Sequence, residues 1–135
     1  MYKLAVILHL LGAAIWIGGH IVLCAVVLPR ALREKNPAPI REFEEGYERL
    51  GVPALIVQLL TGIYLAYQLL PEVSTWFSLE SHLSRGIILK FVLFVATVLL
   101  AVHARLRVHP RLTSETLHVL AIHIVSVTVL SLLFS

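Results

Sequence analysis

The amino-acid sequence predicts an all-α integral membrane protein, a single-domain bundle of four transmembrane helices. Of its 135 residues, 59 % are hydrophobic and only 14 % are charged, whereas a soluble domain carries about 25 % charged residues. The apolar residues gather into four long runs, and a helix needs roughly 20 such residues to cross a bilayer. Polar residues gather between these runs, as loops outside the membrane require.

Each predicted span is bounded by residues that begin or end helices. The spans cover residues 4–28, 52–70, 86–106 and 115–134. Proline suits helix ends, so we expect Pro29 to end the first span and Pro53 to begin the second. Either Thr113 or Ser114 can cap the fourth. The whole chain, residues 1–135, is expected to form one transmembrane domain.

The connection between the first two spans predicts a short amphipathic helix on the cytoplasmic membrane surface. Its apolar residues recur every three or four positions, which is the period of one helix face. They are Ile40, Phe43, Tyr47 and Leu50.

Basic residues predict the orientation of the bundle. They concentrate in the first and third connections, at Arg30, Arg33, Lys35, Arg41, Arg49, Arg105, Arg107 and Arg111. Cytoplasmic loops carry such an excess, so both termini are expected on the outer, periplasmic side of a bacterial inner membrane. Because these residues flank apolar spans, the formal charge of +3 indicates a lipid bilayer as partner and not nucleic acid.

Ionisable side chains inside the spans are the candidate functional residues, because they are costly in a membrane. The candidates are His9, His20, Lys90, His103 and His123, with His118 and Cys24 as weaker candidates. Cys24 is the single cysteine, which excludes an intrachain disulfide.

Alternating helix directions predict two polar levels in the bundle. His9 and Lys90 fall toward the outer side, whereas His20, His103 and His123 fall toward the cytoplasmic side. A single buried histidine is more often a packing residue than a ligand, but several histidines at one level favour a cofactor site.

Imidazole suits haem iron and Cu(II), and histidines on facing helices of a bundle can hold haem b. The chain has no CxxCH motif, which excludes covalent haem. Cu(I) favours cysteine and methionine, of which the chain has one each. The residues therefore favour haem b and leave copper as the alternative.

The chain also resembles known membrane proteins. The stretch from His9 to Gly19, followed by Leu28-Pro29-Arg30, resembles the first helix of the copper-resistance protein D family. It also resembles that of a relative, the HemJ family of haem-dependent protoporphyrinogen oxidases. Residues 43–67 resemble the second helix of these families, and residues 89–103 resemble the third.

The HemJ likeness implies haem b, with His9 as iron ligand and Lys90 as polar partner. His20 and His123 are additions to that pattern and favour the copper-resistance branch. The leading hypothesis is a haem b redox or electron-transfer protein, with protoporphyrinogen oxidase activity as one form of it. Its redox partner would be a quinone or a membrane oxidoreductase. Alternatives are a copper-binding or copper-transport protein and a structural or assembly subunit, and homo-oligomers are left open.

Overall fold

The computed structural model describes residues 1–108, 113 and 115–134, and within them the chain is helical and contains no strand. The helices are α1 (Tyr2–Val22), α2 (Leu28–Glu34), α3 (Ala38–Leu69), α4 (His82–His103) and α5 (Leu117–Phe134). Two π-helical segments, η1 (Leu23–Val27) and η3 (Ala104–Val108), and one 3₁₀ segment, η2 (Val73–Phe77), complete the described elements. The all-α prediction is confirmed. Arg111 and Ser114, used above for orientation and capping, lie outside the described residues.

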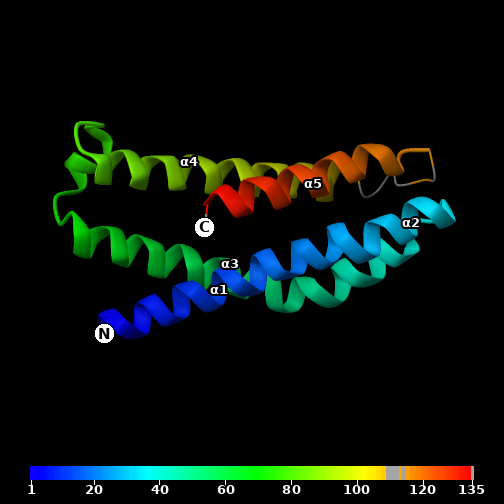
Figure 1. Cartoon of the computed structure of the whole chain (residues 1–135), viewed down its shortest axis with the longest axis horizontal. Coiled ribbons are helices and arrows are strands. Elements are labelled where there is room, and N and C mark those ends of the chain that lie inside the picture. The colour runs from blue at the N-terminus through cyan, green and yellow to red at the C-terminus, as the bar shows by residue number, and fades with distance from the viewer. Residues whose placement is uncertain (109–112, 114, 135) are drawn as a thin grey trace.

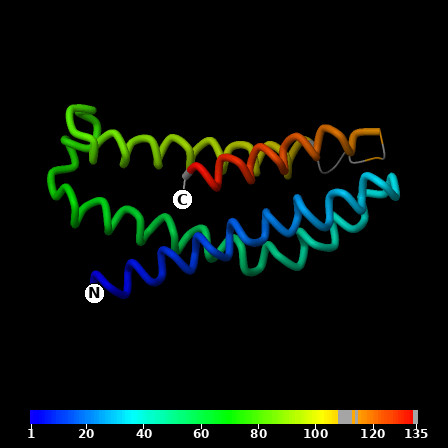
Figure 2. The backbone as a smooth tube through the Cα atoms, viewed as in Figure 1, coloured from blue at the N-terminus to red at the C-terminus, as the bar shows by residue number. Residues whose placement is uncertain are grey.

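The bundle consists of two antiparallel helix pairs. α1 packs along α3, and α4 packs along α5, so that the pairs form two layers in Figure 1. Contacts between α1 and α5 join the layers. The chain runs back and forth along the long axis of the molecule, as the tube in Figure 2 shows.

Three stretches are long and apolar enough to cross a membrane: Tyr2–Glu34, Ala38–Leu69 and His82–Arg107. Large apolar side chains cover the outside of the bundle, with Leu10, Leu60 and Leu99 each more than 60 % exposed. Such a surface fits the hydrocarbon of a lipid bilayer. α5, with 18 residues, is about 27 Å long against a hydrocarbon core of about 30 Å. That α5 also spans the membrane stays a prediction.

The first helix continues past the proline that was expected to end it. η1 follows α1 directly, and Pro29 stands in the first turn of α2, which runs on to Glu34. Proline lacks an N–H and its ring crowds the preceding turn. The wider π-helical turn ahead of Pro29 accommodates both effects, so the helix is interrupted without ending.

The second helix is also longer than expected. The predicted amphipathic segment from Ile40 to Leu50 is helical, but it is continuous with the membrane span in the 32-residue α3. Pro53 lies inside this helix and not at its start. Membrane helices tolerate an internal proline when neighbouring groups compensate for the lost hydrogen bond. In consequence α3 carries Phe43 and Tyr47 against the bundle.

α4 begins four residues earlier than the predicted span. Ser81 and Ser84 form a reciprocal capping box at its first turn. This cap satisfies backbone N–H groups that the first turn would otherwise leave without acceptors. His82 is therefore the first residue of α4.

Candidate functional site: two cavities between the helix pairs

Two cavities lie where the helix pairs face each other, and each contains histidine. The outer cavity, of about 310 Å³, is formed by α3 and α4 together with His9 of α1. The inner cavity, of about 360 Å³, lies nearer η1 and η3 and includes His20 and His123. The two polar levels expected from the sequence thus correspond to two cavities.

His9 is held by α3 through one of its ring nitrogens. Its Nδ1 lies 3.0 Å from the backbone carbonyl oxygen of Gln58 and 3.0 Å from the Thr61 hydroxyl. A carbonyl only accepts, so a neutral His9 carries its proton on Nδ1 and donates it, which leaves the lone pair on Nε2. A side chain at Gly62 would meet the His9 ring, because an added Cβ would lie 3.1 Å from Cε1. Glycine at this position therefore makes room for the imidazole.

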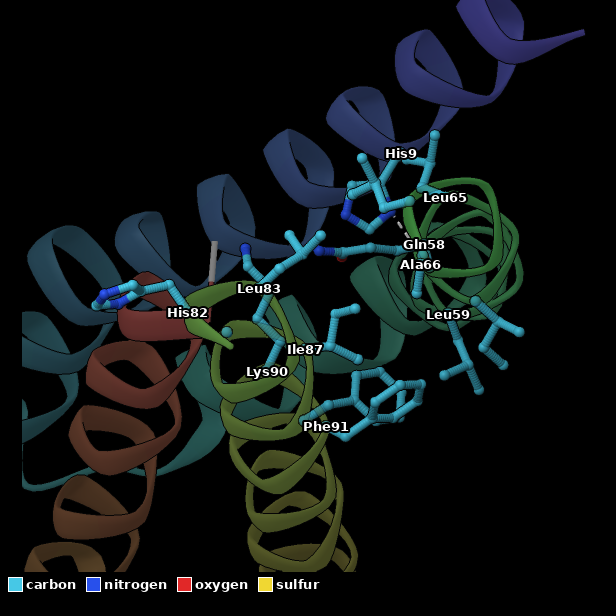
Figure 3. Close-up of a pocket in the computed structure, with 15 residues that line it drawn as sticks. His9, Gln58, Leu59, Leu65, Ala66, His82, Leu83, Ile87, Lys90 and Phe91 are labelled. Carbon is cyan, nitrogen blue, oxygen red and sulfur yellow. Dashed lines mark hydrogen bonds between the residues drawn. The ribbon is translucent and has the colours of Figure 1, made fainter. Parts of the chain in front are cut away.

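Four polar side chains from three helices line the outer cavity: His9, Gln58, His82 and Lys90, all labelled in Figure 3. Gln58 is only 1 % exposed, and its Oε1 has no hydrogen-bond partner. A buried polar atom without a partner is costly and calls for an explanation. The remaining walls are chiefly apolar, with Leu59, Leu83, Ile87 and Phe91 among them. The outer cavity is thus an apolar chamber with a small polar end.

The inner level brings two of the predicted histidines into direct contact. His103 Nδ1 of α4 lies 2.9 Å from His123 Nε2 of α5, and the rings stack with centroids 5.0 Å apart. His123 Nδ1 lies 2.9 Å from the Val119 carbonyl oxygen. In the neutral state His123 therefore donates from Nδ1 and accepts at Nε2, while His103 donates to it. The pair is oriented by the backbone of α5.

His20 lines the same cavity as His123 but belongs to a different helix pair. Its Nδ1 lies 2.8 Å from the Trp16 carbonyl oxygen, so its Nε2 is the nitrogen left for other partners. Tyr47 donates its hydroxyl to the Ile15 carbonyl at 2.6 Å, and its ring meets His20 edge-on at 6.3 Å. α1 and α3 together fix the position of His20.

The weaker candidates lie apart from these groups. Cys24 Sγ lies 3.1 Å from the Thr128 hydroxyl on α5, so the thiol contributes to helix packing. His118 is exposed on α5 and lines neither cavity. Across the described part of the chain no three histidine, cysteine or acidic side chains come together as a metal cluster would require. The His103–His123 pair is the closest approach of two candidate ligands.

Several residues of these cavities were not singled out from the sequence. Gln58 is the clearest, and its signal was present: an uncharged polar residue in an apolar span, three positions before Thr61. Glu48 and Arg105 form an ion pair of 3.1 Å beside the inner cavity, and only Arg105 was used above, as a basic residue that predicts orientation. Glu48 reaches this position because α3 begins at Ala38, ahead of the predicted second span, whereas Arg105 stands in η3 directly after α4.

A comparison with known protein families places part of the chain in a family. Residues 41–134 match the family described as copper resistance protein D, CopD. No curated protein and no solved structure matches the chain. The match covers most of the 135 residues, including α4, α5 and nearly all of α3. The chain therefore belongs to the copper resistance protein D family.

Proposed function

We propose that this chain is a copper-binding membrane protein of copper resistance, with copper held between His103 and His123. The observation that carries the proposal is the 2.9 Å separation of His103 Nδ1 and His123 Nε2. Two nitrogens bound to one ion at about 2.0 Å and at right angles lie about 2.8 Å apart. The pair therefore fits adjacent positions of a tetragonal Cu(II) site better than opposite positions of a linear one.

The surroundings of the pair suit a bound cation. The bond from His123 Nδ1 to the Val119 carbonyl directs Nε2 toward His103, as second-shell contacts of metal-bound histidines do. His20, Glu44 and Glu48 line the adjoining cavity and supply further nitrogen and oxygen atoms. With only two ligands close together, copper would keep exchangeable positions, which favours transfer of the ion over permanent storage.

Copper titration of the detergent-purified protein tests this proposal. We expect about one Cu(II) per chain and an electron paramagnetic resonance spectrum with hyperfine splitting from at least two nitrogens. His103→Ala and His123→Ala should each lower the affinity by about tenfold or more, because a ligand is lost.

His118→Ala is the matched control, since His118 lies on the same helix as His123 but outside both cavities. Its affinity for copper should equal that of the unaltered protein. If His103→Ala and His123→Ala bind copper as tightly as the His118→Ala control, copper is bound elsewhere and the proposal fails.

Haem b is a second candidate for the same cavity. His20 and His123 approach it from different helix pairs, and the bond from His20 Nδ1 to Trp16 leaves Nε2 available. These two imidazoles would hold the haem iron, and the haem would supply electron-transfer chemistry. Iron ligation by His9 with Lys90 as its polar partner likewise stays a prediction.

Absorption spectra of the oxidised and dithionite-reduced protein, after haem-supplemented expression, separate the two candidates. A Soret band that disappears in His20→Ala and His123→Ala would favour haem. Copper near one equivalent without porphyrin would favour the first proposal.

A further inference from the structure

The outer cavity has polar groups that the proposed copper site does not use. His9, Gln58 and Lys90 lie at its polar end, whereas the His103–His123 pair adjoins the inner cavity. The amide of Gln58 is buried, and its Oε1 lacks a hydrogen-bond partner. The cavity therefore offers a binding site whose ligand must satisfy a buried amide.

We propose that the outer cavity binds the head group of a membrane quinone. A quinol carries two hydroxyl groups, and His9 Nε2 and Gln58 Oε1 are two acceptors for them. The oxidised quinone carries two carbonyl oxygens, and the Lys90 ammonium group and the Gln58 Nε2 amide are donors for those. The same three side chains thus match both redox forms of one ligand.

The apolar walls agree with this class of ligand. Leu59, Ile63, Leu83, Ile87 and Phe91 line the cavity, and such walls suit a ring and a hydrocarbon tail. A volume of about 310 Å³ is at the lower end of the range for small-molecule sites, about 300–1,000 Å³. The cavity therefore fits a single ring, and the tail would extend toward lipid.

Other apolar ligands match the polar end less well. An ionised fatty acid offers a carboxylate to Lys90, but no proton donor to Gln58 Oε1 or His9 Nε2. A haem could use His9 Nε2 as a ligand, yet its propionates only accept hydrogen bonds when ionised. Neither ligand would satisfy the buried acceptor of Gln58.

A substitution at Gly86 in the cavity wall offers an independent way to block the site. Gly86 lines the cavity, and an added Cβ there would meet no atom within 4 Å. A leucine at this position would fill space that the ligand needs, without removing a polar group. Gly46 on α3 also faces open space but lies outside the cavity, so it provides the matched control.

The experiment uses decylubiquinone as the probe and Trp76 as the reporter. Trp76 stacks on the cavity residue Phe91, with ring centroids 6.0 Å apart. The chain has one other tryptophan, Trp16, and its signal is measured in a Trp76→Phe variant and subtracted. We expect saturable quenching of the Trp76 fluorescence, since quinones accept energy and electrons from excited indoles.

Two substitutions test the assignment of the site. Gln58→Leu keeps the backbone carbonyl that holds His9 but removes the amide, and it should weaken binding by about tenfold or more. Gln68→Leu, at an exposed position of the same helix, should leave it unchanged. Gly86→Leu should abolish quenching, and Gly46→Leu should not.

Quenching that does not saturate would overturn the proposal. So would an affinity for decylubiquinone in Gln58→Leu and Gly86→Leu that equals that of the unaltered protein. A Soret band that is lost in His9→Ala and kept in His20→Ala would overturn it as well, by assigning the cavity to haem. Copper titration of the same samples is expected to be unaffected. If copper does not bind, the proposed quinone site is therefore unaffected. If decylubiquinone does not bind, the proposed copper site is likewise unaffected.

Discussion

Trp16 of α1 donates its indole N–H to the hydroxyl of Ser131 on α5 over 2.9 Å, and both residues are buried. α1 belongs to one helix pair and α5 to the other, so this bond crosses the interface between the two layers. It lies where the pairs are in contact, beside the inner cavity that Trp16 also lines. The bond thus holds together the two layers between which the cavities lie.

Removing the acceptor of this bond should destabilise the fold. Ser131→Ala leaves a buried N–H without a partner, which costs about 1–3 kcal/mol of unfolding free energy. This change in unfolding free energy is measured by unfolding the protein in mixed detergent micelles with an increasing fraction of dodecyl sulfate. In a Trp16→Phe background the same substitution should cost much less, because the donor is already gone. Ser126→Ala, at a half-buried position of α5, is the control, and a loss as large as that of Ser131→Ala would contradict the prediction.

The close approach of α1 and α3 should depend on Gly12. An added Cβ at Gly12 would lie 2.8 Å from the Ala54 backbone oxygen, whereas one at Gly18 would meet nothing within 4 Å. Gly12→Ala should therefore cost about 1–3 kcal/mol by forcing the helices apart. Gly18→Ala should be neutral or stabilising by up to about 1 kcal/mol, because alanine is the better helix former. The same unfolding measurement checks both, and equal effects would contradict a tight contact at Gly12.

Cysteine labelling tests the predicted orientation. In a Cys24→Ser background, Glu80→Cys places a thiol in the connection before α4, and Glu45→Cys places one in the first part of α3. Both positions are exposed. If the basic connections are cytoplasmic, a membrane-impermeant maleimide should label the Glu80 site in intact cells. It should reach the Glu45 site only after the membrane is opened, and the reverse pattern would invert the topology.

The sequence was sufficient to predict the helical membrane fold and the two polar levels. Apolar length and composition alone determine where helices can cross, and alternating directions then place His20, His103 and His123 at one level. The contact between His103 and His123 needs the rotation of α4 about its axis, which periodicity does not determine within tens of degrees. Only the packed structure supplies it.

The helix ends were predicted less well, for a local reason. Pro29 and Pro53 were interpreted as boundaries, because proline removes a hydrogen bond from a helix in water. In this chain one proline follows a π-helical segment and the other lies inside α3. Gln58 was not predicted as a site residue, because only ionisable side chains were considered as candidates. Its burial nevertheless makes its polar side chain costly in the bundle.

The position of the outer cavity has a consequence for how a ligand reaches it. Its walls are chiefly apolar side chains of α3 and α4, two helices that are long and apolar enough to cross a membrane. A hydrophobic molecule can therefore enter sideways from the bilayer after partitioning into it, so that diffusion in two dimensions governs its arrival. The concentration that matters is moles of ligand per mole of lipid. The total ligand concentration that half-saturates the protein, expressed per volume of solution, should therefore rise in proportion to the lipid added to the assay.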